Sequence, residues 1–186
     1  MLVVSGRATS TSILKNLVLP GVGHFTILDH DKVSYADAGN NFFLDGFDSI
    51  GKNRAAEAVR LLAELNDSVE GRADTRPLSV VLDTDPAWLA SFTVVVAHNL
   101  DTALLERLSA FLWSDSARPP LVVVRSAGFL AEFFIQFHEH TSEHGFPSPT
   151  GELSTSSHRK SFRKRAVPSH RQAVPGAPRS RVSPRL

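Results

Sequence analysis

Short continuous runs of hydrophobic residues recur along this chain, separated by stretches in which apolar residues fall three or four positions apart. Continuous runs are typical of strands buried on both faces, and the wider spacing is typical of helices with one buried face. The pattern predicts strands at 2–4, 24–28, 92–96 and 121–125, and helices after the hydroxyl-rich 9–12, at 51–66 and at 101–113. Strands that alternate with helices predict an α/β fold with a mostly parallel sheet and flanking helices.

Weaker signals fill the rest of the first 140 residues. Residues 34–49 are rich in Asn, Asp and Gly and are expected to be irregular, whereas 68–73 and 129–137 are strand-like and 85–90 predicts a helical turn. The hydroxyls of 9–12 are candidate N-caps for the first helix, or an anion site at its N-terminus, and Asp101 is a candidate cap for the last helix. Trp88 and Trp113 are expected in the core.

The first forty residues have the β-α-β spacing of a Rossmann-like nucleotide-binding fold, with an acid, Asp29, about twenty residues after the first turn. Such a fold needs glycines in that turn, so that the backbone can approach phosphate. Here the turn begins Ser5, Gly6, Arg7, Ala8, and Gly6 is its one glycine through position 12. The scaffold is therefore expected to persist without its nucleotide chemistry, which predicts a partner protein that holds no cofactor.

The amino-acid composition excludes several classes of functional site. The 186 residues are 42% hydrophobic and include no cysteine, which excludes disulfides, thiolate catalysis and thiolate metal sites. No apolar run approaches the ~20 residues of a membrane span, and the N-terminus lacks the features of a secretory signal. We expect an intracellular protein of the cytoplasm, the nucleus or both, with no membrane partner. No Gly-x-Ser-x-Gly sequence supports a serine hydrolase.

The charge is unevenly distributed. Nine of the twenty Lys and Arg, but one of the nineteen acidic residues, lie from Gly151 onward, where no apolar periodicity remains. We predict a folded domain at 1–140 and a disordered basic tail at 141–186. Clusters such as 163–165 suit nucleic acid or a nuclear signal, although a merely solvated tail is the favoured interpretation. His138, His140 and His144 have a spacing compatible with metal, but no organised carboxylates surround them, so no metal site is predicted.

Several longer strings are family-specific. They are Ile13-Leu14-Lys15-Asn16-Leu17-Val18-Leu19-Pro20-Gly21-Val22-Gly23, Asp37-Ala38-Gly39-Asn40-Asn41-Phe42-Phe43-Leu44 and Ser49-Ile50-Gly51-Lys52-Asn53-Arg54-Ala55. Over roughly residues 2–140 the chain resembles the regulatory, non-catalytic (amyloid-precursor-binding) subunits of heterodimeric enzymes that activate the ubiquitin-like modifier of neddylation. The resemblance implies a ThiF/MoeB-like adenylation fold that is incomplete at both ends.

Compared with active members of that fold, the chain lacks groups that hold ATP. Asn41 stands where active members carry an arginine, Arg54 where they carry a lysine, and Asn99 lies where a metal-binding aspartate is expected. Adenylation needs cations and Mg²⁺ to stabilise phosphate charge, and an amide is a poor substitute for a carboxylate on Mg²⁺. The resemblance therefore implies no catalytic residue in this chain, and Asp29, which would face a ribose in an active relative, is expected to be structural.

The resemblance also implies a partner. Regulatory halves pair with a catalytic half that performs ATP-dependent adenylation and thioester formation, and the ubiquitin-like modifier binds through the complex. We predict that Asn40, Asn41, Phe42, Phe43 and Leu44 face this partner, although the two phenylalanines could instead belong to the domain's own core. An N-terminal segment whose arginine reaches the partner's ATP site is expected to precede Leu2 in the family.

Two further hypotheses stay open. The chain could be a nucleotide-dependent Rossmann-fold enzyme with a degenerate phosphate loop, or a truncated gene product with little function. Residues 169–178, with suitable codons read one base later, spell Leu-Ile-Asp-Lys-Pro-Phe-Pro-Glu-Leu-Arg, close to a segment expected in the family. We therefore hypothesise that the sequence after about Thr141 is frameshifted or mis-spliced, which the coding DNA would test.

Overall fold

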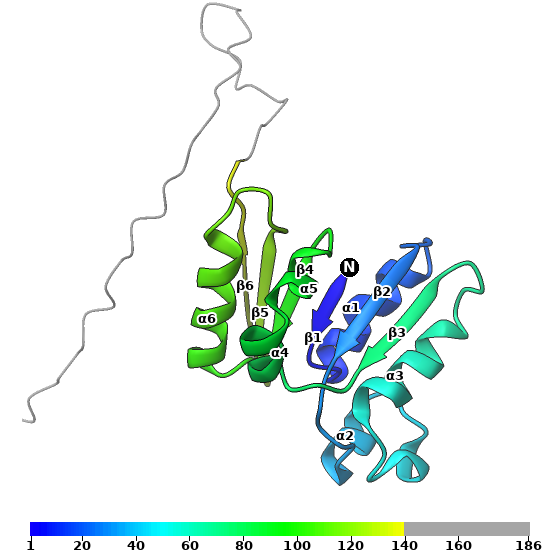
Figure 1. Ribbon diagram of the computed structural model, residues 1–186. Coiled ribbons are helices and arrows are strands. Elements are labelled where there is room, and N and C mark those ends of the chain that lie inside the picture. The colour runs from blue at the N-terminus through cyan, green and yellow to red at the C-terminus, as the bar shows by residue number, and fades with distance from the viewer. Residues whose placement is uncertain (140–186) are drawn as a thin grey trace, which may run out of the picture.

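Six strands form one sheet in this computed structural model, which describes residues 1–139 (Figure 1). The strand order is β3-β2-β1-β4-β5-β6, and every neighbouring pair is parallel except β5 and β6, which are antiparallel. The strands are β1 (Leu2–Val4), β2 (His24–Leu28), β3 (Glu70–Asp74), β4 (Val95–His98), β5 (Leu121–Ala127) and β6 (Leu130–Gln136). The predicted α/β fold with a mostly parallel sheet is confirmed.

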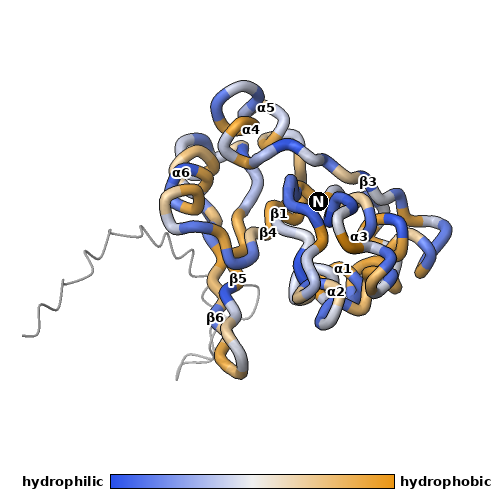
Figure 2. The backbone as a smooth tube through the Cα atoms, turned by 90° about the horizontal axis from the view of Figure 1, so that it is seen from below, coloured by the Kyte–Doolittle hydropathy of each residue, from blue (hydrophilic) through white to orange (hydrophobic). Residues whose placement is uncertain are grey.

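The helices lie in two layers, one on each face of the sheet (Figure 2). One layer contains α1 (Ala8–Val18) and α3 (Arg54–Ala63), and the other contains α4 (Leu78–Thr84), α5 (Pro86–Ala90) and α6 (Thr102–Trp113). A short helix α2 (Tyr35–Asn40) and a 3₁₀ helix η1 (Gly46–Ser49) connect β2 to α3.

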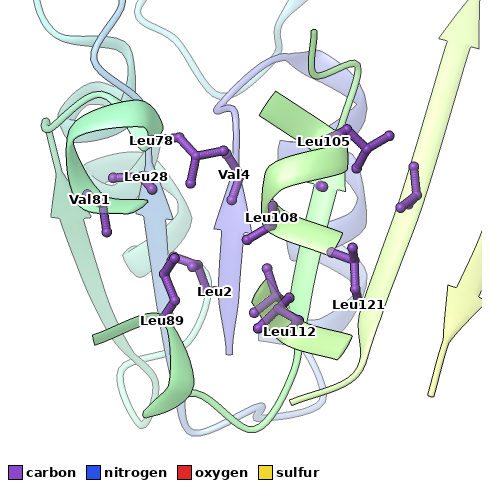
Figure 3. Packing of buried hydrophobic residues seen from close by; sticks show 13 residues of the cluster. Leu2, Val4, Leu28, Leu78, Val81, Leu89, Leu105, Leu108, Leu112 and Leu121 are labelled. Atoms are coloured by element: carbon purple, nitrogen blue, oxygen red, sulfur yellow. The ribbon is translucent and has the colours of Figure 1, made fainter. Parts of the chain in front are cut away.

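The two layers pack on separate hydrophobic clusters, because successive side chains of a strand point to opposite faces. Leu2 and Val4 of β1 face α4, α5 and α6, where they meet the fully buried Leu89 and Leu108 (Figure 3). Val3 faces the other layer. The central strands are thus buried on both faces, which explains their continuous apolar runs.

Residues 34–49, predicted to be irregular, contain α2 and η1, so that prediction was wrong. Ser34 closes a capping box: its hydroxyl accepts the N–H of Asp37, and the Asp37 carboxylate accepts the N–H of Ser34. The Ser-x-x-Asp spacing was the available signal. Helix α4 was also missed, although Pro77 precedes it and Leu78 and Val81 are buried on one face.

Three other predictions need correction. Helix α1 begins at Ala8, with Arg7 as N-cap and no side-chain cap, so the hydroxyls of 9–12 lie inside the helix. The strand predicted at 92–96 lies at Val95–His98, in register with β1 and β5, because Phe92 turns aside to pack against Trp88. Trp113, expected in the core, is 39% exposed.

The predicted cap of the last helix is confirmed, since Asp101 caps α6 by accepting the N–H of Ala103 at 2.9 Å. Asn53, for which no capping role was predicted, caps α3 by accepting the N–H of Ala56. None of the helices described within 1–139 has the length and apolar character to cross a membrane. The predicted tail at 141–186 and the candidate ligands His140 and His144 lie outside the described residues.

Candidate functional site: the carboxyl ends of the parallel strands

The polar residues singled out in the sequence converge where the parallel strands end. Ser5 and Gly6 follow β1, Asp29 follows β2, and Asn99 follows β4, whose last residue is His98. Strand order reverses between β1 and β4, and ligands of open α/β sheets bind beside the carboxyl ends at such a switch point. The backbone there is unusual, since Ser5 has a φ of +82°, a region that rarely suits a residue other than glycine.

Asp29 is held by the chain itself. Its carboxylate accepts the N–H of Gly6 at 2.7 Å and two hydrogen bonds from Arg54, at 2.8 and 3.1 Å. Asp29 is 5% exposed and Arg54 is 4% exposed. A Cβ at Gly6 would be tight against Ile27, at 3.3 Å, and would touch the pair at ordinary contact distances of 3.5 Å from Asp29 and 3.7 Å from Arg54. The acid at the expected ribose position is therefore already saturated with donors.

Arg54, at the start of α3, gathers three carboxylates. Besides Asp29, it reaches Asp31 at 2.8 Å and Asp37 at 3.2 Å. Burial lowers the pKa of the Arg54 guanidinium, but the hydrogen bond and charge of Asp29, joined by Asp37 and Asp31, outweigh it and raise this pKa above its ordinary value. The guanidinium thus links α3 directly to Asp29 at the end of β2 and to Asp37 in α2. Through Asp29 it also links α3 to Gly6 in the turn after β1.

Asn41 forms a second buried link. Its side-chain oxygen accepts the Thr11 hydroxyl at 2.9 Å and the N–H of Phe43 at 3.0 Å, and its side-chain nitrogen donates to the carbonyl of Gly6 at 3.3 Å. Asn41 is 4% exposed. Asn41, which stands where active members carry an arginine, therefore joins the degenerate loop, α1 and the Phe42-Phe43 segment.

Asn99 supports the sheet. Its amide donates to the carbonyl of Ser126 and accepts the N–H of Ser126, each at 2.9 Å. Its φ of +46° suits an asparagine. Both polar atoms of the amide are engaged by the backbone of β5, at the position where a metal-binding carboxylate was expected.

The burial of His98 predicts a pH dependence of the domain's stability. It is 3% exposed, its Nε2 lies 2.9 Å from the Ser126 hydroxyl, and burial, followed by the charge of Arg7, lowers its pKa below the ordinary 6.5. The unfolded chain therefore binds a proton before the folded one does, and stability should fall as pH drops below about 6.5. Chemical unfolding across pH 7 to about 4.5 should show this slope, and H98Q should flatten it. H30Q, at an exposed histidine, is the control; an unchanged slope in H98Q would contradict the assignment.

An open cleft of about 410 Å³ lies beside this network. It is lined by Arg7, Asp31, Lys32, Ser34, Ala36, Asp37, Asn40 and Arg54. Asp29, His30 and Asp31 could bring three ligand atoms within 4.8 Å of one another for a metal ion. Both carboxylates, however, are already paired with the Arg54 cation, so the donor set suits the guanidinium better than a metal.

The residues predicted to face a partner divide into two sets. Asn40 and Phe42 are exposed, Phe42 at 88%, whereas Asn41, Phe43 and Leu44 are buried. Phe43 packs in the cluster under α1 and α3, and Phe42 meets its ring edge-on with centroids 5.4 Å apart. The exposed members of the block thus rest on a segment anchored by Asn41.

The parallel sheet, its switch point and the loop-to-helix turn after β1 define a Rossmann-like α/β domain of the nucleotide-binding type. In this domain the Gly6 N–H of the loop and the carboxylate of Asp29 are hydrogen-bonded within the chain itself. More particularly, the chain belongs to the ThiF family, whose model matches residues 9–143.

The chain is also similar to named proteins. It is 46% identical to the NEDD8-activating enzyme E1 regulatory subunit of Xenopus laevis over 138 residues and 43% identical to that of Gallus gallus, in each case over 74% of this chain and 25% of the relative. It is 38% identical to ubiquitin-like modifier-activating enzyme 1 of Mus musculus, over 73% of this chain and 12% of that protein. The resemblance found in the sequence is confirmed, and the chain spans about a quarter of the length of the regulatory subunits it matches.

Proposed function

We propose that this chain is a non-catalytic portion of the regulatory subunit of an activating enzyme for a ubiquitin-like modifier of the NEDD8 class. In this role it binds a catalytic subunit, which carries out adenylation and thioester formation, and it meets the modifier through that complex. The proposal includes an intracellular location. The similarity to named regulatory subunits supports the class, and the geometry of the strand ends supports the non-catalytic role.

The Asp29–Arg54 pair is the observation that carries the non-catalytic role. A nucleotide at this end of the sheet needs free loop N–H groups and unpaired cations for its phosphates. Here the Gly6 N–H is donated to Asp29, and the Arg54 guanidinium is shared among three carboxylates. Breaking these contacts would leave buried charges unpaired. ATP would therefore bind at the cost of the domain's own stability.

The proposed partner surface centres on Phe42. Exposed aromatic side chains commonly anchor protein interfaces, and Phe42 projects from a segment that Asn41 and Phe43 hold in place. An anchor fixed in this way loses little conformational entropy on binding.

Coexpression with a catalytic subunit of a NEDD8-activating enzyme tests the proposal. We expect a heterodimer on size-exclusion chromatography with light scattering, and F42D should weaken its affinity at least about tenfold, the effect of losing ~1.4 kcal/mol at an anchor. V80D, at a 42% exposed valine on α4, is the control and should leave the complex intact. Absence of a complex with the unaltered chain would overturn the proposal and favour the truncated-product hypothesis.

A calorimetric titration with Mg²⁺-ATP separates the enzyme hypothesis from this one. The cleft lined by Arg7 and Lys32 is the place where a nucleotide would have to enter. We expect no saturable binding to the chain alone. Saturable binding at physiological ATP concentration, abolished by R7A, would contradict the non-catalytic role.

A further inference from the structure

Helix α2 is the only helix described within residues 1–139 that buries no residue. Tyr35 at its start is 75% exposed, and Asn40 at its end is also exposed. The helix lies beyond the carboxyl ends of the strands, outside both helix layers (Figure 1). Most helices in proteins are stabilised by packing an apolar face, and an isolated helix of six residues is marginal in water. Apolar burial therefore does not hold α2 in place.

The residues on either side of α2 are anchored to the domain. Val33 is 3% exposed, and its N–H donates to the carbonyl of Lys52 at 2.9 Å. Asn41 is 4% exposed, and its side chain accepts the Thr11 hydroxyl. The segment 34–40 thus spans two fixed points, so α2 can move while the rest of the domain keeps its place.

A single ion pair connects α2 to a distant segment. Nη1 of Arg54 donates to Oδ2 of Asp37 at 3.2 Å, and among the described residues no other side chain of α2 forms a hydrogen bond or ion pair beyond the N-cap Ser34. The other hydrogen bonds of Arg54 go to Asp29 and Asp31. If Asp37 moves into water, the guanidinium keeps two carboxylate partners, so no buried charge is left unpaired. The ion pair can therefore open reversibly.

Helix α2 also forms one wall of the cleft of about 410 Å³ at the strand ends. The lining residues from α2 and its N-cap are Ser34, Ala36, Asp37 and Asn40. The opposite lining comes from the turn after β1, the segment after β2 and the start of α3. The position of α2 therefore sets the width of this cleft.

We propose that α2 is a hinged flap on the cleft, held closed by the Arg54–Asp37 pair. When the pair separates, α2 swings out between its anchors at Val33 and Asn41, loses its helical turns and widens the cleft. A segment that is ordered by one charge pair and released as a unit is a common form of conformational switch. The inference concerns this chain alone and does not rest on its pairing with a catalytic subunit.

Hydrogen exchange on the full 186-residue chain tests the flap. The Ala38 N–H donates to the Ser34 carbonyl at the start of α2, and the Val33 N–H lies in the anchor. Local opening exposes the first amide and leaves the second hydrogen-bonded. After correction for intrinsic rates, Ala38 should exchange at least about tenfold faster than Val33.

D37N tests the ion pair that holds the flap. The variant removes the charge but keeps an oxygen that can accept the Ser34 N–H, so the helix cap persists. Exchange at Ala38 should become about tenfold faster, because a hydrogen bond to a charged group is lost, and exchange at Val33 should not change. D48N removes an exposed carboxylate of the neighbouring η1 and is the matched control, with no effect expected at Ala38.

R54K separates the ion pair from the helix cap. A lysine keeps a cation beside the buried Asp29 but lacks the guanidinium fork that also reaches Asp37. R54K alone should therefore speed exchange at Ala38, and adding D37N should have little further effect. If Asp37 acted only as a helix cap, D37N would have the same effect in both backgrounds.

Chymotrypsin, which cleaves after aromatic residues, gives a second measurement. Tyr35 lies in α2, whereas Phe129 is fully exposed in the turn between β5 and β6. Cleavage in a helix requires local unfolding, and its rate follows the population of the open form. D37N should raise the rate of cleavage after Tyr35 about tenfold and leave cleavage after Phe129 unchanged, as read by mass spectrometry.

Equal protection of Ala38 and Val33, unchanged exchange and cleavage in D37N, or an equal effect of D37N with and without R54K would each overturn the inference. None of these measurements involves a catalytic subunit. Failure of the proposed function and failure of this inference are therefore distinguishable.

Discussion

Replacing Arg54 with methionine is expected to lower the free energy of unfolding by about 3–5 kcal/mol, the range found when one partner of a buried ion pair is removed. The variant would leave Asp29, 5% exposed, with the Gly6 and Asp31 N–H groups as its remaining donors. It would also leave Asp31 and Asp37 without their shared cation. Urea denaturation followed by circular dichroism measures the loss.

R60M is the matched control. Arg60 also lies on α3 and pairs with Asp45 and Glu57, but its side chain is 45% exposed, so its removal should change stability little. The double variant R54M/D29N should recover part of the loss, because the uncompensated buried charge is gone. A loss in R54M below about 1 kcal/mol, the usual value of an exposed pair, would show that the guanidinium does not hold this end of the sheet together.

Replacing Asn41 with leucine should cost about 2–4 kcal/mol, since three groups lose their hydrogen bonds to Asn41 together. They are the Thr11 hydroxyl, the Phe43 N–H and the Gly6 carbonyl. The same change should weaken binding of a catalytic subunit, because Phe42 and Phe43 lose the contact that orients their segment. Thermal unfolding and the coexpression assay measure the two effects.

The neighbouring residue provides the control for Asn41. Asn40 is exposed and belongs to the same predicted partner block, so N40L should leave the melting temperature nearly unchanged. If N41L and N40L proved equally stable, the hydrogen bonds of Asn41 would not contribute to the fold. If N41L alone lost stability but bound the catalytic subunit normally, the orienting role would be wrong.

Local patterns predicted most elements because they depend on which face of a segment is buried. The continuous run Leu2–Val4 is typical of a strand buried on both faces, and the spacing of Leu105, Leu108 and Leu112 is typical of a helix with one buried face. The displaced β4 shows the limit of this reasoning. Phe92 and Thr93 suit a strand as well as Val95 does, and only the register with β1 and β5 decides where pairing begins.

The neighbours Phe42 and Phe43 show why the partner block could not be sorted from the sequence. They are chemically identical and adjacent, yet one is 88% and the other 4% exposed. The difference arises because Asn41 bonds to Thr11, thirty residues away, and this link sets the direction of the segment. No local period carries that information.

The sequence by itself determined most of the alternating strands and helices, although not α2, η1 and α4. It also determined the degenerate loop and the membership of the family, because these depend on neighbouring residues and their composition. Only the tertiary structure decided that Asp29 and Arg54, twenty-five positions apart, neutralise each other inside the site. It also decided that the apolar strand β6 lies at the end of the described sheet. The physical reason is the same in both cases: burial of a charge or exposure of a strand depends on what the folded chain brings beside it, and that neighbour is distant in sequence.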